Sequence, residues 1–344
     1  MKIAYIHDWL IFPGGAEEVF FDIINNNLLD NKQEEKSEKK IFTTFHYNKY
    51  KNKSNLDIEA VVSGKYIRKY YRHLMPFFPV FMKKLSMKIK KFDPDIVIIS
   101  SFAIAKNLDI GENAKKILYL HSPMQYIRTH YEEYARKMQK QWWLKHKIYQ
   151  YSSKKLRKWD INYNKFDEYY FNSNYTKESF QNTYNVKIKN WKIRNPLVKI
   201  ASYQKISIEN LFTLEKKKYF VYIWRLVKFV KHVDIIIKAF NQTWDKLVIV
   251  GDWPDKEYLE SIANENIIFS WYIWNHEDKY WNLLAQSKAL INITKESFGI
   301  VTKQALDLGV TVIWLNKWAT PELEWEKILI DEVSVKNLIK AIRE

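Results

Sequence analysis

The sequence predicts an α/β fold made of two Rossmann-like domains, each with a doubly wound parallel sheet. Short apolar runs that suit buried strands alternate with amphipathic stretches of helical period along most of the chain. The length of 344 residues also exceeds what one such domain requires. We therefore expect two domains facing a cleft, with a ligand bound at the carboxyl ends of their strands.

The apolar runs fall into two groups separated by a break. In the first group the predicted strands are Ile3–Ile6, Ile41–Phe45, Ile96–Ile99, Ile117–Leu120 and Tyr169–Phe171. In the second they are Tyr219–Ile223, Leu247–Val250, Ile267–Phe269, Ala289–Ile293 and Thr311–Ile313, with helices over Val233–Phe240, Lys256–Ala263, Asp278–Ala285 and Ile300–Leu308. Pro196 and mixed polar residues interrupt the rhythm between the groups. The sequence thus predicts domains over residues 1–195 and 215–344, joined by a linker over 196–214.

Composition excludes several classes of protein and site. The absence of Cys rules out disulfides, thiolate metal sites and a Cys nucleophile, and it suits a reducing compartment. No apolar run approaches the roughly 18 residues of a membrane span. The start, Met1–His7, becomes polar too soon for a signal peptide. Asp93 and Asp95 precede a predicted strand, which is the wrong end of a sheet for a ligand, so we predict no metal site.

The formal net charge of +17 is concentrated in one region. Residues 51–200 carry 31 basic and 12 acidic side chains, whereas residues 201–344 carry 19 of each. The segment Lys65–Lys91 has nine Lys or Arg residues, no acid and several aromatic residues, which is typical of an element that binds an anionic membrane surface. The alternative is a solvated helix face over core aromatics. A nucleic-acid binder is a further alternative, but the chain lacks a recognised nucleic-acid motif, so we expect no such partner.

Polar residues and glycines after predicted strands of the first domain are candidate ligand contacts. Gly14 and Gly15 follow the first strand and precede a helix, so their backbone N–H groups can approach an anion; a plain turn explains them equally well. His121 follows the strand Ile117–Leu120, where it can act as a hydrogen-bond donor or base. The alternative is a structural histidine with satisfied hydrogen bonds.

The second domain offers two pairs of polar residues. Arg225 follows the strand Tyr219–Ile223, and Lys231 comes six residues later, which makes a clamp for phosphate oxygens. Glu296 and Gln304 lie on either side of the turn at Gly299, and a carboxylate and an amide suit sugar hydroxyls. Each pair, taken alone, is equally compatible with ordinary solvated surface groups.

Taken together, these segments resemble glycosyltransferase family 4, whose members are retaining enzymes of the two-domain GT-B architecture. The resemblance runs over nearly the whole chain and includes HDWL…GGAE, VSGKYIRKYYRHLMPFFP, FDPDIVIISS, YLHSPMQYIRTHYEEY, LRKWD, FNSNYT, YIWRLVKFVKHVD, VIVGDWPDKEYLE, ESFGIV and NKWATPE. The tract RHLMPFFP together with HSPMQY is similar to mannosyltransferase-like members of O-antigen (lipopolysaccharide) and exopolysaccharide assembly.

The resemblance implies an activity and roles for the candidate residues. A hexose, with mannose as first candidate, would pass with retention from a nucleotide-diphosphate sugar to a lipid-linked or saccharide acceptor. No metal or other cofactor is expected, since Arg225 and Lys231 would neutralise the leaving diphosphate. His121 would line the sugar side of the cleft, and Glu296 would bind hydroxyls of the transferred sugar. The remaining implied contacts, to acceptor, phosphate, sugar and ribose, are Gly14, Gly15, Phe298, Gly299, Ile300, Val301 and Gln304.

The resemblance also implies a location and shows departures from the family pattern. The basic first domain would face a lipid-diphosphate acceptor, so we expect a cytoplasmic protein peripheral to the inner face of the cytoplasmic membrane. Gln304 replaces a family Glu, and Trp318-Ala319 replaces a double Gly. Relatives continue with a further helical stretch, so we expect that the chain is truncated at Glu344. These departures suggest an alternative function, a catalytically inactive relative that binds a nucleotide or carbohydrate.

The chain has only 7 Gly but 14 Trp. Trp residues occupy positions where the family has Gly, and an indole there would fill the cleft; these positions are Trp224, Trp253, Trp271, Trp314 and Trp318. Gly and Trp together make 21 of 344 residues, which is close to an ordinary Gly share. We therefore hypothesise that UGA codons, which encode Gly in the source genome, are rendered as Trp in this sequence.

Overall fold

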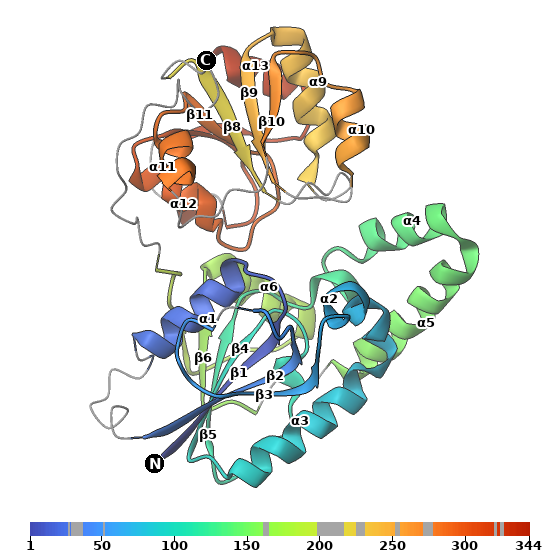
Figure 1. Cartoon of the computed structure of the whole chain (residues 1–344), viewed down its shortest axis with the longest axis vertical. Coiled ribbons are helices and arrows are strands. Elements are labelled where there is room, and N and C mark those ends of the chain that lie inside the picture. Colours follow the sequence, from blue (N-terminus) through green and yellow to red (C-terminus); the bar gives the residue numbers. More distant parts are fainter. Residues whose placement is uncertain are drawn as a thin grey trace. The chain divides into compact units, whose positions relative to one another are not determined.

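The computed structural model describes every residue except 27, 29–36, 51, 161–164, 198–216, 225–230, 252–254, 271–277, 320–321 and 324–326. The chain divides into two compact units, Met1–Leu197 and Val198–Glu344 (Figure 1). Most of the predicted linker falls outside the described residues. Each unit has its own sheet and its own hydrophobic core.

The first unit is built on seven parallel strands in the order β3-β2-β1-β4-β5-β6-β7. Their bounds are β1 (Lys2–Leu10), β2 (Glu38–His46), β3 (Ile58–Ser63), β4 (Ile96–Ser101), β5 (Lys115–Leu120), β6 (Glu168–Phe171) and β7 (Trp191–Ile193). The strand order reverses between β1 and β4. In open α/β sheets a ligand crevice lies beyond the carboxyl ends of the strands at such a reversal.

Helices cover both faces of this sheet. They are α1 (Gly15–Asn25), α2 (Ile67–Tyr70), η2 (Tyr71–Phe77), α3 (Phe78–Phe92), η3 (Ala105–Asn107), η4 (Gln125–Ile127), α4 (Tyr131–Gln141), α5 (Trp143–Trp159) and α6 (Asn174–Tyr184). Local sequence explains their ends: the Ser173 hydroxyl accepts the N–H of Thr176 at the start of α6, and Asp93 ends α3 in the left-handed region. The helices α4 and α5 form a hairpin that projects from the sheet (Figure 1).

The second unit has six parallel strands in the order β10-β9-β8-β11-β12-β13. Their bounds are β8 (Tyr219–Ile223), β9 (Lys246–Val250), β10 (Ile267–Ser270), β11 (Ala289–Asn292), β12 (Thr311–Leu315) and β13 (Lys327–Ile330). The helices are α9 (Val233–Thr243), α10 (Lys256–Ser261), α11 (Asp278–Ala285), α12 (Ile300–Asp307) and α13 (Val335–Arg343). Here the order reverses between β8 and β11, which is where a ligand crevice is expected in such a sheet.

The prediction of two doubly wound parallel-sheet domains is confirmed, and all ten predicted strands are present. Three strands were missed: β3, β7 and β13 lie at sheet edges or are only three or four residues long. The first strand was predicted too short. Because β1 continues to Leu10, the residues His7, Asp8 and Trp9 are strand residues and not a loop. In the described part of the chain, no helix combines the length and apolarity needed to cross a membrane.

Candidate functional site

At the strand reversal of the first unit, the carboxylate of Asp8 is surrounded by backbone N–H groups of the loop after β4. It accepts hydrogen bonds from the consecutive N–H groups of Phe102–Ala105 at 2.6–3.0 Å, and it is fully buried. Burial raises the pKa of Asp8, and hydrogen bonds from this backbone oppose the rise. The Asp8 carboxylate thus occupies a concave set of backbone N–H groups that could otherwise bind an anion. It also links β1 to the loop after β4.

Beside Asp8, two histidines converge on one serine. The rings are His7 on β1 and His121 after β5, and Ser100 on the intervening strand β4 lies between them. The Ser100 hydroxyl oxygen is 2.7 Å from Nε2 of His121 and 3.1 Å from Nδ1 of His7. Burial lowers the pKa of His121 to about 3 and lowers that of His7 well below its usual range. Both rings are therefore neutral at pH 7.

The predicted glycine turn begins the helix α1. Gly14 precedes its first turn in an extended conformation, and Gly15 is its first residue. Gly14 has no side chain to cap the helix, and the carboxylate of Glu17 lies so close that a Cβ on Gly14 would sit 2.7 Å from its Oε2. The turn therefore leaves α1 with N–H groups at the carboxyl edge of the sheet, next to an acidic side chain that offsets part of their attraction for anions.

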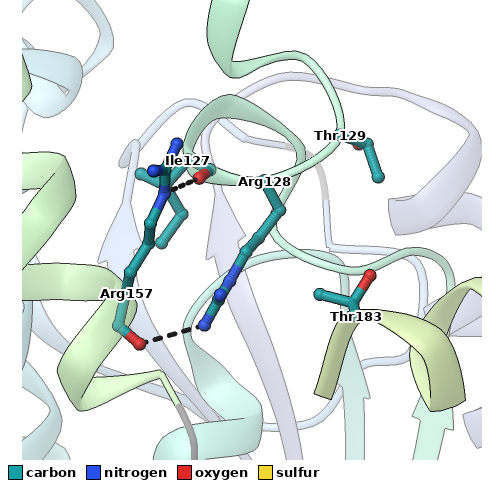
Figure 2. A pocket seen from close by; sticks show the side chains of 5 residues that line it. All are labelled: Ile127, Arg128, Thr129, Arg157 and Thr183. Atoms are coloured by element: carbon teal, nitrogen blue, oxygen red, sulfur yellow. Dashed lines mark hydrogen bonds between the residues drawn. The ribbon is translucent and has the colours of Figure 1, made fainter. Parts of the chain in front are cut away.

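A shallow pocket of about 360 Å³ lies elsewhere in this unit (Figure 2). Its lining residues are Ile127, Arg128, Thr129, Arg157 and Thr183. The Arg157 Nε donates to the carbonyl of Ile127 at 2.5 Å, and an Nη of Arg128 donates to the carbonyl of Arg157 at 3.0 Å. Both guanidinium groups thus tie the loop after β5 to α5.

The same loop is held by a buried charge. Asp160 is fully buried and lies 3.6 Å from Nε of Arg128. Its carboxylate also accepts hydrogen bonds from Lys106, Asn107 and Tyr184. Of the two arginines that line the pocket, Arg128 therefore compensates part of an internal carboxylate, and none of the predicted site residues lines the pocket.

At the strand reversal of the second unit, two predicted residues form an ion pair. Lys231 lies just before α9, and Glu296 follows β11. The distance from Nζ of Lys231 to Oε1 of Glu296 is 2.5 Å. The hydroxyl of Thr294 lies 2.9 Å from the same carboxylate oxygen and 2.7 Å from Oδ1 of Asn292. The side chains of Lys231 and Glu296 retain 18% and 20% of their exposure. The pair is therefore fixed by the fold but still open to solvent at the carboxyl edge of the sheet.

Next to this pair, Gly299 begins α12. Its φ of +85° lies in the region that favours Gly, and a Cβ there would meet the Thr302 hydroxyl at 3.2 Å. Asn292 donates from Nδ2 to that hydroxyl at 2.7 Å and so links β11 to α12. Phe298 is buried, whereas Ile300 and Val301 are half-buried. The arrangement leaves the N–H groups at the start of α12 beside the Lys231–Glu296 pair.

Gln304 lies inside the unit, away from solvent. It is 3% exposed, and its Oε1 accepts a hydrogen bond from the hydroxyl of Tyr280 on α11. Its amide thus links α12 to α11, and its predicted contact with the ribose stays a prediction.

Several predicted positions lie outside the described residues or in unexpected places. Arg225, Trp253 and Trp271 are outside the described residues. Trp314 lies fully buried in the core on β12, so the expectation that its indole would fill a cleft is wrong. Trp318 has a φ of +69°, a conformation that bulky residues rarely adopt.

Sequence patterns missed three of the residues that shape these sites. Asp8, Ser100 and Thr294 each connect a strand end to the site, but single polar residues at strand ends carry no spacing signal. The sequence places Asp8 shortly before the glycine turn. Its burial could not be predicted, because it depends on a loop more than ninety residues away. Among the described residues, no group of three His, Asp or Glu side chains is placed to hold a metal.

Comparison with known proteins identifies the family. The family described as Glycosyltransferase Family 4 matches residues 37–196, and Glycosyl transferases group 1 matches residues 204–344. The chain is a family 4-like glycosyltransferase. Its two parallel-sheet domains fit the GT-B fold that the sequence resemblance implied.

Solved glycosyltransferases share the fold of this family 4-like chain at low identity. HepE from Anabaena, in complex with UDP and glucose, is 14% identical with a TM-score of 0.68, over 99% of this chain and 89% of that one. WaaG, a glycosyltransferase involved in lipopolysaccharide biosynthesis, gives the same identity, TM-score and coverage. Sucrose-phosphate synthase from Thermosynechococcus elongatus is 13% identical with a TM-score of 0.69, over 99% and 88%. No protein of curated function matches the chain in sequence.

Proposed function

We propose that this glycosyltransferase transfers a hexose with retention from a nucleotide-diphosphate sugar to a lipid-linked or saccharide acceptor. The observation that carries the proposal is the Lys231–Glu296 pair at the strand reversal of the second sheet. A cation and a carboxylate side by side suit a donor that has a diphosphate at one end and hydroxyls at the other. The UDP and glucose bound by HepE support a donor of this class.

The proposed chemistry is electrostatic. Lys231 and Arg225 neutralise the charge that develops on the leaving diphosphate, in place of a metal. The N–H groups at the start of α12 add a helix N-terminus that favours the same phosphate. When the phosphate engages Lys231, the carboxylate of Glu296 is released to accept hydrogen bonds from sugar hydroxyls. The ion pair thus keeps the two groups in place before the donor binds.

The acceptor side of the proposal rests on a basic surface of the first unit. The helices α2, η2 and α3 span most of Lys65–Lys91, and Phe77 at the end of η2 and Val80 and Met87 on α3 are each more than half exposed. Lys83 and Lys84 are exposed on the same helix. Exposed apolar side chains among lysines suit the headgroup region of an anionic membrane. We therefore propose peripheral binding at the cytoplasmic face, beside a lipid-diphosphate acceptor of polysaccharide assembly.

We also propose that some Trp residues stand at native glycine positions, decoded from UGA. Trp318 has a φ of +69° and Trp244 a φ of +61°, and both values suit Gly rather than an aromatic residue. Trp244 is an additional position that the motifs did not indicate. The coding DNA tests the idea directly, because UGG codons at Trp244 and Trp318 would refute it.

Donor hydrolysis tests the proposed function. A chain with Gly at Trp224, Trp253 and Trp318 is assayed with GDP-mannose, UDP-glucose and related nucleotide sugars, after a thermal-shift screen of the same set. We expect one donor to stabilise the protein and to be hydrolysed or transferred. Arg225→Ala and Lys231→Met should each lower kcat by at least about tenfold, because each removes a cation from the leaving group.

Two results would change the proposal. Stabilisation by a nucleotide sugar without any turnover would favour the inactive, nucleotide-binding relative, for which the buried Gln304 is the supporting observation. Full activity of Arg225→Ala would contradict the role of Arg225 in neutralising the leaving diphosphate. Lys238→Met, which changes an exposed Lys on α9 away from the pair, is the matched control and should remain active.

A further inference from the structure

The contacts of His7, Ser100 and His121 fix the positions of their protons. The Nδ1 of His7 lies 3.1 Å from the backbone carbonyl oxygen of Ser100, and a carbonyl oxygen only accepts hydrogen bonds. His7 therefore carries its proton on Nδ1. The same atom lies 3.1 Å from the Ser100 hydroxyl oxygen, but because it is protonated it cannot accept the hydroxyl proton.

The hydroxyl proton of Ser100 then has one ring partner left. Nε2 of His121 is 2.7 Å from the hydroxyl oxygen and is the ring atom that can accept that proton. A neutral imidazole that accepts at one nitrogen carries its proton at the other. His121 is accordingly protonated on Nδ1, and its Nδ1–H is a donor.

We propose that Ser100 is a positioning residue that, held by His7, keeps His121 in the Nδ1-protonated tautomer, so that His121 donates a hydrogen bond to an oxygen of the sugar substrate. Ser100 acts through His121 and does not itself touch substrate. The role of His121 at the sugar rests on the proposed function. The assignment of Ser100 and His7 rests on the geometry alone.

The buried surroundings support a donor rather than a base. His7 and Ser100 are fully buried and His121 is 7% exposed. The ring of His7 stacks on Phe20 of α1 at a centroid distance of 4.7 Å, which fixes the plane of its Nδ1–H. This burial disfavours an imidazolium, and so disfavours His121 as a general base. The sequence left two roles open for His121, hydrogen-bond donor and base. The proposal assigns the donor role.

Nuclear magnetic resonance tests the tautomer without any ligand. Long-range ¹⁵N–¹H correlation on the full chain, labelled with ¹⁵N-histidine, separates Nδ1–H from Nε2–H rings, and His121→Gln assigns the signal among the eight histidines. We expect the Nδ1–H form in the unsubstituted chain. Ser100→Ala should shift His121 toward a mixture of tautomers, and Ser100→Thr should restore the single form.

Controls separate positioning from general disturbance of the sheet. Thr44→Val removes a buried hydroxyl of β2 that has no partner in the described part of the chain, and it should leave the tautomer unchanged. If Ser100→Ala does not fold, Ser100→Cys keeps the shape with a weaker donor and should give the same shift. An Nε2-protonated His121 in the unsubstituted chain, or an unchanged tautomer in Ser100→Ala, would overturn the proposal.

Kinetics then link the tautomer to the reaction. With the donor selected by the screen, Ser100→Ala should lower kcat by up to about tenfold with little change in KM for the donor, as expected for one lost hydrogen bond. An altered tautomer with unchanged kcat would overturn the substrate role of His121. Inactivity of the chain with Gly restored at Trp224, Trp253 and Trp318, which is the background for these kinetics, would instead count against the proposed function and leave the tautomer result standing.

Discussion

The buried histidines make stability depend on pH, and this dependence can be predicted residue by residue. The pKa of His121 is lowered to about 3, and that of His7 is also well below 6.5. Below pH 6.5 the unfolded chain binds protons that these folded rings do not bind. The free energy of unfolding therefore falls as pH falls from 6.5 toward 3, by up to about 1.4 kcal/mol per pH unit for each ring.

The test compares slopes rather than absolute stabilities. Urea unfolding between pH 6 and 5 should show a shallower loss of stability in His121→Gln than in the unsubstituted chain, by up to about 1.4 kcal/mol per pH unit. His73→Gln, which changes an exposed histidine of η2, is the control and should keep the original slope. Equal slopes in all three proteins would contradict a neutral, buried His121.

At the scale of elements, three helices end with a residue in the left-handed region. Asp93 ends α3, Asn185 ends α6 and Trp244 ends α9, with φ values of 54°, 52° and 61°. Asp and Asn tolerate this region because their short side chains bond to nearby backbone. Trp has no such compensation, so the end of α9 is strained in a way that the other two are not.

Trp244→Gly should therefore stabilise the protein. The indole is 58% exposed, so little buried surface is lost, and removal of the strained conformation should contribute about 1 kcal/mol. Tyr151→Gly is a matched control, since it removes a 62% exposed aromatic residue from the interior of α5. It should destabilise by about 1 kcal/mol because Gly is unfavourable in a helix. Thermal or urea unfolding gives the stability of both variants. If Trp244→Gly destabilised the protein as much as Tyr151→Gly, the assignment of Trp244 to a glycine position would be contradicted.

The elements also show what the sequence could and could not predict. The strands of both cores were found because apolar runs such as Leu247–Val250 are buried on both faces and leave a clear pattern. Lys231 and Glu296 were found because they follow predicted strands of the second domain, and the family resemblance then gave them roles. Their direct contact was not foreseen, because it spans 65 residues and depends on the order of β8 and β11 in the sheet. Gln304 was expected to face a ligand, but pairing with Tyr280 depends on how α11 packs against α12.

At the scale of the whole molecule, the charge is divided unevenly between the units. Residues 51–200, nearly all of which belong to the first unit, carry a net charge of +19, whereas residues 1–50 carry −2 and residues 201–344 are balanced. Part of that charge is used internally, since Lys88 pairs with Glu59 and Lys90 pairs with Asp109. Lys83 and Lys84 remain exposed on α3 beside Val80 and Met87. The hairpin of α4 and α5 adds Trp142 and Trp143, both more than half exposed, and α5 packs against η2.

This division predicts that the first unit alone directs the protein to anionic bilayers. In vesicle sedimentation, the full chain should bind vesicles with about 30% anionic lipid and should not bind neutral ones, and binding should weaken as salt rises. Lys83→Glu with Lys84→Glu should lower the affinity at least about tenfold, because each lysine near the surface contributes about 1 kcal/mol. Lys238→Glu with Lys246→Glu makes the same charge change on exposed residues of the second unit and should have little effect. Equal losses in the two double variants would show that net charge, and not the surface of α3, determines binding. Tighter binding to a DNA duplex than to the vesicles would instead favour a nucleic-acid partner.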